Sequence, residues 1–508
     1  MELNKRIGAV MLFFTILFIQ CFQFAAGKRD TIDVTYPTRP TETTLYFDGR
    51  YNTTRASTTV ITTTEPPTQE GYIPAGSDAD LWSVSFGGTG EDVVRSIYYC
   101  ANGDYVVCGN STSDDMTFTG LYVEGTARPY AFVAKFSSSG SLRWINSIYG
   151  NNICIANDVC ELSDGSIAVA GYTRATNLIT SAPLSSSVID AFIFRYSSTG
   201  DVLNKYVADG SGYDYFYSIS PCPDGGYVAG GSSTSTDGDF NMTSTGAVLI
   251  KFNSSNAIVS SVTLNGGSGG TIHDVSVDTN GTVFAACVTT SSDGDFAQFS
   301  GLGAGKTDSL VLKYSSDLSV LRWSVVIAGG GNDRFEYICA DNDGGCVVAG
   351  NFETKNNAGV TDGFFAGYPN YGYADGYAVR INSVGTVTGR RGFGGSQIDY
   401  ITGVCRCSGS YVFCGYTKSS DFNFSTLGNI GGYDSFVTVV STSDFSGSAV
   451  SVHPIAGTDS DTAFAICGSG YVYTVAGTTS STDEFFWTTD PMVTQENTGF
   501  AVKYELES

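Results

Sequence analysis

A block of about 61 residues repeats seven times between Leu81 and Ser508, and few architectures accommodate such a series. Each copy holds four short runs rich in Val, Ile, Tyr and Phe, which is the composition of β-strands. The turn between the first two runs contains a glycine in every copy: Gly103, Gly165, Gly225, Gly281, Gly344, Gly409 and Gly470. Six residues after the first six of these come Gly109, Gly171, Gly231, Cys287, Gly350 and Gly415.

Four strands per unit and seven units predict an all-β fold, a seven-bladed β-propeller of four-stranded blades. The last copy ends after its third run, near Tyr504, whereas Leu81–Phe86 precedes the first copy as an orphan fourth run. We expect these two segments to pair and close the ring, which removes the exposed sheet edges of an open stack. The alternative is that both ends are frayed, which would leave a three-stranded blade and an unpacked Trp82.

The N-terminal segment predicts export. A basic start, an apolar run from Ile7 to Phe24 and the small residues Ala25-Ala26-Gly27 are typical of a secretory signal, which we assign to residues 1–27. An uncleaved signal anchor is the alternative. Residues 28–77 carry fourteen Thr between Thr31 and Thr68 together with several Pro, and we expect a disordered stalk or linker there. The propeller then occupies residues 78–508, secreted or at the cell surface.

The balance of acidic and basic residues excludes several classes of binding partner and of active site. With 26 Lys and Arg against 50 Asp and Glu, the net charge is −24, which disfavours nucleic acid and anionic membrane surfaces. His273 and His453 are the only two histidines, so most histidine-based metal sites and catalytic triads are ruled out. No catalytic set is marked, and an enzyme is less expected than a binding protein. We expect a monomer.

Paired carboxylates on a glycine turn suggest one possible cofactor, Ca²⁺. The element Ser-x-Asp-Gly-Asp-Phe occurs in full at 235–240 and 291–296, and its candidate ligands are Asp237, Asp239, Asp293 and Asp295. The spacing of strong Ca²⁺ loops is incomplete here. The alternative is a corner whose Phe fills the core between blades. No other cofactor is indicated.

Aspartates and third-run cations recur from copy to copy. The aspartates are Asp92, Asp158, Asp214, Asp274, Asp333, Asp399 and Asp461, but their distances to the turn glycine differ, so they do not share one position. They form either a carboxylate ring at one channel mouth or a series of loop caps that bind backbone N–H groups. The cations are Lys135, Arg195, Lys251, Lys313, Arg380 and Lys503, and they either form salt bridges with neighbouring Asp or are solvated.

Twelve cysteines follow the signal, several at positions shared between copies. Export and the even count permit disulfides, for example between the arms of a hairpin such as Cys100 and Cys108. Shared positions favour small buried side chains instead.

The order Gly-Gly, Asp, Asp-Gly-Gly-Tyr-Val, Gly and Ser-x-Asp-Gly-Asp-Phe resembles the secreted bacterial β-propeller repeat (SBBP-like) proteins. Copy four is the most similar, with His273–Gly281 followed by Ser291–Phe296. The resemblance covers residues 81–508. It implies the propeller architecture and no particular chemistry.

The loops from second to third run are long and irregular, which favours recognition at the face they form. Their unrepeated aromatic residues are the candidate ligand-binding set: Phe364, Phe365, Tyr368, Tyr371, Tyr373, Phe485, Phe486 and Trp487. The alternative for these residues is a local satellite core. We therefore expect a non-catalytic binding or adhesion propeller for an extracellular glycan or protein. The alternatives are a carbohydrate hydrolase or lyase that uses carboxylates at the ring mouth, and a self-assembling surface-layer component.

Overall fold

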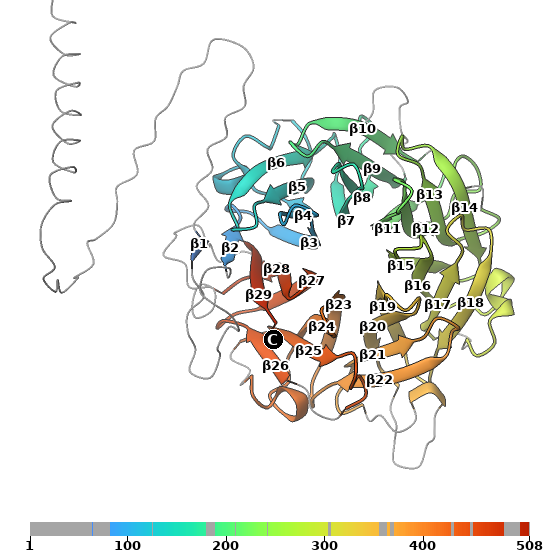
Figure 1. Ribbon diagram of the computed structural model, residues 1–508. Helices are drawn as coiled ribbons and strands as arrows, with labels where there is room; N and C mark the ends of the chain where they lie inside the picture. Colours follow the sequence, from blue (N-terminus) through green and yellow to red (C-terminus); the bar gives the residue numbers. More distant parts are fainter. Residues whose placement is uncertain are drawn as a thin grey trace, which may run out of the picture. The chain divides into compact units, whose positions relative to one another are not determined.

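A computed structural model of the chain describes residues 63–64, 82–123, 125–178, 188–208, 210–240, 242–302, 306–354, 363–365, 370–427, 431–447, 451–481 and 498–506. Residues 82–506 form seven four-stranded antiparallel sheets arranged as the blades of a β-propeller (Figure 1). The prediction of an all-β, seven-bladed ring is therefore confirmed. The predicted signal, nearly all of the predicted stalk, and Tyr368, Phe485, Phe486 and Trp487 lie outside the described residues.

The first four blades follow one another in chain order. Blade one consists of β3 (Asp92–Tyr99), β4 (Tyr105–Ser111), β5 (Tyr130–Phe136) and β6 (Leu142–Ile148). Blade two has β7 (Cys154–Glu161), β8 (Ile167–Thr173), β9 (Asp190–Tyr196) and β10 (Val202–Val207). Blade three has β11 (Asp214–Pro221), β12 (Tyr227–Ser233), β13 (Gly246–Phe252) and β14 (Ile258–Asn265), and blade four has β15 (Gly270–Val277), β16 (Val283–Thr289), β17 (Asp308–Tyr314) and β18 (Leu321–Ile327).

The remaining blades include the one that closes the ring. Blade five has β19 (Asp333–Ala340), β20 (Cys346–Phe352), β21 (Asp375–Ile381) and β22 (Val387–Phe393), and blade six has β23 (Asp399–Cys407), β24 (Ser410–Thr417), β25 (Asp434–Ser441) and β26 (Ser451–Ile455). Blade seven has β27 (Asp461–Ser469), β28 (Val472–Thr479), β29 (Thr498–Glu505) and β2 (Ser83–Phe86), with the short β1 (Thr63–Thr64) beside β2. Four 3₁₀ turns lie in loops: η1 (Met116–Phe118), η2 (Gly294–Gln298), η3 (Gly363–Phe365) and η4 (Phe422–Phe424).

The ring closes as the sequence predicts, because β2 pairs antiparallel with β29 as the outer strand of blade seven. Val84 and Phe86 are 1% exposed in the core between blades seven and one. Trp82 donates from Nε1 to the carbonyl of Ser138, 2.8 Å away in blade one. Trp144 and Trp323 make the same contact to the next blade, so the closing strand occupies a regular place in the repeat.

The hydrophobic core lies between neighbouring blades, and the third-strand cations add a polar link there. Lys251 in β13 donates from Nζ to Asp224 Oδ2 at 2.6 Å within its own blade and to the carbonyl of Ser316 at 2.7 Å in the next. Arg380 pairs with Asp341 and reaches the carbonyl of Thr442 in blade six. The salt-bridge alternative is thus confirmed for Lys251 and Arg380, and both side chains join hairpin turns across blades.

The cysteines pack as small core residues. All twelve are free thiols among the described residues, and all except Cys339 are buried. Within the same ranges no helix is long and apolar enough to cross a membrane.

Candidate binding site in the central channel

Every innermost strand carries a β-bulge at the same position, and the extra residue points into the centre of the ring. The registers shift between Val94 and Ser96 in blade one and at the corresponding place in each other blade. A bulge re-aims a side chain that regular pairing would direct elsewhere. The seven extra residues, which we call the waist, are Arg95, Asn157, Tyr217, His273, Glu336, Thr402 and Phe464.

In six of the seven blades a second-strand glycine lies opposite the bulge, whereas blade four forms the same bulge with Cys287 at this position. A Cβ on Gly109 would lie 1.9 Å from the carbonyl oxygen of Val93, and one on Gly231 would lie 1.8 Å from that of Tyr215. In the blades that carry this glycine, the second strand therefore approaches the first too closely for a side chain at its position. Gly477 holds this place in blade seven, seven residues after the turn glycine instead of six.

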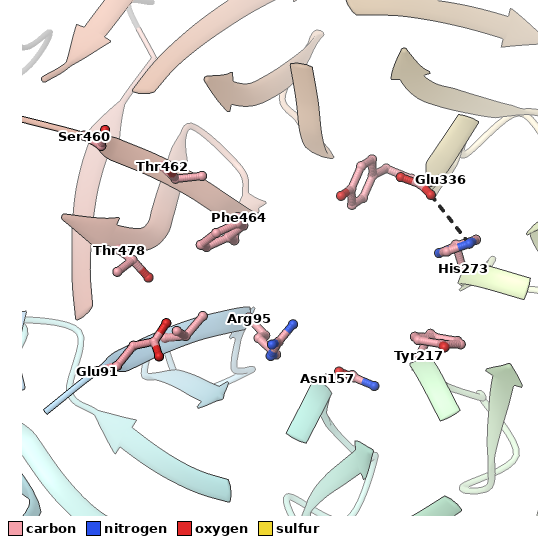
Figure 2. Close-up of a pocket in the computed structure, with 12 residues that line it drawn as sticks. Glu91, Arg95, Asn157, Tyr217, His273, Glu336, Ser460, Thr462, Phe464 and Thr478 are labelled. Atoms are coloured by element: carbon pink, nitrogen blue, oxygen red, sulfur yellow. Dashed lines mark ion pairs between the residues drawn. The ribbon is translucent and has the colours of Figure 1, made fainter. Parts of the chain in front are cut away.

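The waist lies where two cavities of the channel meet, because five of its seven residues line both cavities. The cavity at the end where the inner strands begin has a volume of about 490 Å³ and is also lined by Glu91, Ser460 and Thr478 (Figure 2). The cavity at the other end has a volume of about 850 Å³ and is lined by residues from all seven blades. First strands begin and second strands end beside the smaller cavity, so it lies at the face from which the loops between second and third strands leave, where the sequence predicts recognition.

An aromatic ladder leads from the rim of that face to the waist. Tyr172 contacts Tyr215 edge to face, with ring centroids 5.1 Å apart, and Tyr215 stacks on Tyr217 at 5.7 Å. Tyr217 then stacks on His273 at 5.4 Å. Burial lowers the pKa of His273, while the nearby carboxylate of Glu336 opposes that shift. The ladder offers rings and hydroxyl groups in a line, which suits a ligand with flat apolar faces and polar edges.

Hydrogen bonds fix the orientation of the polar waist residues. Arg95 donates from Nε to Oδ1 of the buried Asn110, 2.8 Å away. Asn157 donates from Nδ2 to the carbonyl of Phe216 at 2.7 Å, and Thr402 donates to the carbonyl of Ala463 at 2.7 Å. Figure 2 shows Arg95 reaching toward the middle of the opening, with Asn157 beside it.

The recurrent aspartates divide into two structural groups. Asp92, Asp214, Asp333, Asp399 and Asp461 are the first residues of their inner strands and are 1% exposed or less. Their carboxylates accept bonds from Ser and Thr hydroxyls at the end of the second strand, and several also from a loop N–H, such as Gly88 to Asp92 at 2.7 Å. These five are loop caps, so the alternative of a seven-carboxylate ring at the mouth is wrong.

Asp158 and Asp274 belong to the second group, which lies just past the bulge in blades two and four. The hydroxyl of Ser218, between them in blade three, is 2.9 Å from Asp158 Oδ2 and 2.8 Å from Asp274 Oδ1. One hydroxyl hydrogen cannot serve two carboxylates, so the pair needs one further proton. Burial, followed by repulsion from Asp158, raises the pKa of Asp274 to about 7, and burial also raises that of Asp158.

The predicted aromatic ligand residues separate into packed and exposed rings. Phe365 is fully buried and stacks on Phe352 at 4.9 Å, so it fills the core of blade five and offers no exposed surface. Phe364 is half-buried against Phe365. Tyr373 is 67% exposed, and Tyr371 is 46% exposed and stacks on Phe422 at 4.3 Å. Tyr371 and Tyr373 therefore have the exposed ring surface that ligand binding requires, and they stay candidate ligand-binding residues.

The predicted Ca²⁺ ligands serve as acceptors for loop N–H groups and for a tyrosine hydroxyl. Asp237 accepts from the N–H of Ser211 and Asp239 from the Tyr206 hydroxyl, while Asp293 and Asp295 accept from N–H groups of Gly267 and Asn265. In the part of the chain described, no three His, Cys, Asp or Glu side chains converge as a metal site would require. Phe240 and Phe296 of the same elements are buried, in agreement with the alternative of a corner that fills the core.

Sequence reasoning missed the waist, although a signal for it exists. Each waist residue lies three positions after the first residue of its inner strand. That first residue is Asp in five blades, but Cys154 in blade two and Gly270 in blade four. When the copies are aligned on their Asp residues alone, the waist residues of blades two and four therefore do not line up with those of the other blades. The second-strand glycines mark the bulge, and the residue following the glycine's partner is the one that enters the channel.

No protein-family model and no curated protein sequence matches this chain. Among solved structures, it is similar to the WD40 domain of Pan2 from Neurospora crassa, with a TM-score of 0.44 and 9% identity over 86% of this chain and 100% of that one. Sqt1 from Chaetomium thermophilum gives 0.38 and 12% over 83% and 98%, and a Bacteroides caccae protein of unknown function gives 0.32 and 12% over 62% and 94%. The propeller assignment follows from the chain's own strand pairing.

Proposed function

We propose that this protein is a secreted or cell-surface binding propeller that recognises an extracellular glycan or protein without catalysis. The binding site is the mouth of the smaller channel cavity together with the surrounding loops from second to third strands. The export signal and the resemblance to SBBP-like repeats support the location and the class. Exposed Tyr371 and Tyr373 extend the same face.

One observation carries this proposal: seven equivalent positions hold seven different side chains. Packing alone would repeat one residue type, as it does at the capping aspartates and second-strand glycines. At the waist the backbone is repeated and the chemistry is not, with a cation, an anion, an amide, an imidazole, a hydroxyl and two aromatic rings. Such divergence on a fixed frame is typical of recognition.

The alternative of a carbohydrate hydrolase or lyase draws on carboxylates at the ring mouth. Five of the seven recurrent aspartates are occupied as loop caps, and Glu336 is held by Arg334, whose Nε lies 2.9 Å from Oε1. The binding function therefore has the stronger support.

The test is a binding screen of the full chain against a panel of glycans and extracellular proteins, followed by two variants. Tyr217→Ala removes the ring that links the ladder to the waist, and we expect about tenfold weaker binding or more. The control is Tyr471→Ala, which removes a 54% exposed tyrosine from a hairpin turn between first and second strands on the opposite face. Equal effects of the two variants, with unchanged melting temperatures, would place the ligand elsewhere.

A further inference from the structure

We propose that the waist is a subsite for the carboxylate group of an acidic sugar residue, with Arg95 as its binding partner. This inference rests on the proposed function and specifies the chemistry of the ligand. It begins from the placement of one guanidinium group in a strongly acidic chain.

Arg95 is held so that its outer edge faces the channel. The bulge of β3 directs the side chain inward, and Asn110 on β4, only 6% exposed, accepts the bond from Nε. The two Nη groups have no carboxylate within ion-pair distance among the described residues, whereas Arg334 and Arg380 both do. A guanidinium group with Nε tied and both Nη groups directed into a cavity is prepared for a planar anion that binds through two oxygens.

The one carboxylate of the waist, that of Glu336, does not compete for Arg95. Glu336 lies across the opening and is neutralised by Arg334, and its Oε1 is 3.5 Å from Nε2 of His273. Glu91 lines the same cavity with an exposed carboxylate, which disfavours a ligand group with two negative charges such as a phosphate monoester. The electrostatics therefore favour a monoanion.

The walls beside Arg95 favour a sugar as the carrier of that monoanion. Phe464 and Tyr217 provide ring surfaces, and Tyr215 and Tyr172 continue them toward the rim. Asn157 has its amide nitrogen engaged, which leaves Oδ1 to accept from a ligand hydroxyl. Ring surfaces with separate polar acceptors suit a pyranose, whose faces are apolar and whose edges carry hydroxyls.

Bound carboxylate has a spectroscopic consequence at His273. A negative charge in the cavity that His273 shares with Arg95 stabilises the imidazolium form, so the pKa of His273 should rise from its depressed value. The chain contains only one other histidine, His453 on the outer strand β26 of blade six. The two imidazole Hε1 signals therefore provide a probe and an internal control in one proton NMR spectrum.

The experiment titrates the full chain with glucuronate and, separately, with glucose while both histidine signals are followed. We expect glucuronate to shift the His273 signal saturably and to bind at least about tenfold more tightly than glucose, with His453 unchanged. Arg95→Gln should abolish this preference, and Arg95→Lys should restore part of it. Arg322→Gln, at an exposed arginine on the outer strand β18, is the matched control and should leave binding unchanged.

Three results would overturn the proposal. Two are equal responses to glucuronate and glucose, and a glucuronate response that survives in Arg95→Gln. The third comes from a parallel titration with a peptide that has a free C-terminal carboxylate: a response to this peptide and none to glucuronate. The proposed function has a separate outcome: if the panel shows binding to a neutral glycan that Tyr217→Ala abolishes and Arg95→Gln does not, the function stands and the carboxylate subsite is wrong.

Discussion

The substitution Asp274→Asn tests whether Asp158 and Asp274, which face each other across the Ser218 hydroxyl in the channel wall, share one additional proton. In the folded chain the carboxyl of Asp274 lies 2.8 Å from the Ser218 hydroxyl and accepts, also at 2.8 Å, from the N–H of Ile338, and Asp158 lies on the other side of Ser218. An asparagine side chain has the shape of the protonated acid and supplies a permanent donor. We therefore expect it to stabilise the fold where the wild-type pair would lose its proton.

The direction and the size of the expected change in the free energy of unfolding follow from the pKa of Asp274. Its pKa rises from 3.8 to about 7, so between these pH values the folded chain binds a proton that the unfolded chain has released. Stability therefore falls as the pH rises from about 4 through 7. The full change corresponds to about 4 kcal/mol for this group. That value is a ceiling, because both carboxyl groups line the 850 Å³ cavity and are only half-buried.

The assay is urea unfolding of wild type and variant between pH 4 and 8. The difference in free energy of unfolding should be small at pH 4 and should grow in favour of the variant, by as much as about 4 kcal/mol, by pH 8. Taking the difference removes the contributions of Asp92, Asp333 and Asp461, whose pKa values are also raised. Exposed Asp317, whose pKa is lowered by Ser315 and Ser319, is the control, because Asp317→Asn should give a difference that is flat above about pH 5. A flat difference for Asp274→Asn would refute the shared proton.

Three further perturbations test ring closure, a glycine turn between blades and the predicted Ca²⁺ loops. Deletion of Leu81–Gly87 removes the buried Trp82, Val84 and Phe86 and should lower the free energy of unfolding by on the order of 5 kcal/mol or more, so an unchanged melting temperature would contradict ring closure. Gly200→Ala should destabilise more than Gly165→Ala: both positions have positive φ, but only Gly200 has a tryptophan ring atom, of Trp144, 2.9 Å from the added Cβ. If the Ser-x-Asp-Gly-Asp-Phe loops bind Ca²⁺, EDTA should lower the melting temperature by several degrees, and an identical melt would show that these loops are not Ca²⁺ sites.

The fold could be predicted from the sequence because its determinants are local and repeated. Strand runs, turn glycines and the orphan run Leu81–Phe86 each carry a signal within a few residues, and seven copies average out the irregular ones. Ring closure followed from counting runs, and β2 pairs with β29 accordingly. The salt-bridge alternative for the third-strand cations could be stated for the same reason, since a salt bridge to the adjacent hairpin turn needs only neighbouring segments, and Lys251 forms one.

The site was harder to predict because its geometry depends on one extra residue per strand. If side chains simply alternate between the two faces of β3, nothing in the sequence distinguishes Arg95 from its neighbours. The bulge that turns Arg95 into the channel becomes visible only in the pairing of β3 with β4. The prediction of Phe365 as a ligand-binding residue failed for a different reason. In sequence Phe365 resembles an exposed aromatic residue of a long loop, but it stacks on Phe352 in the core of blade five. Burial of that ring is decided by contacts between segments, which composition does not reveal.

The arrangement of charge at the waist limits how a ligand can enter. A ring of identical residues would have rotational symmetry and would hold a ligand on its axis in any of seven orientations. Here Arg95 belongs to blade one and Glu336 to blade five, with Phe464 in blade seven and the aromatic ladder in blades two to four. The field across the channel therefore has a direction, and the apolar surface is concentrated on particular blades. A ligand that binds here must itself be asymmetric, with its anionic group toward blade one and its ring along blades two to four, and this requirement is the physical basis for specificity in an otherwise repetitive frame.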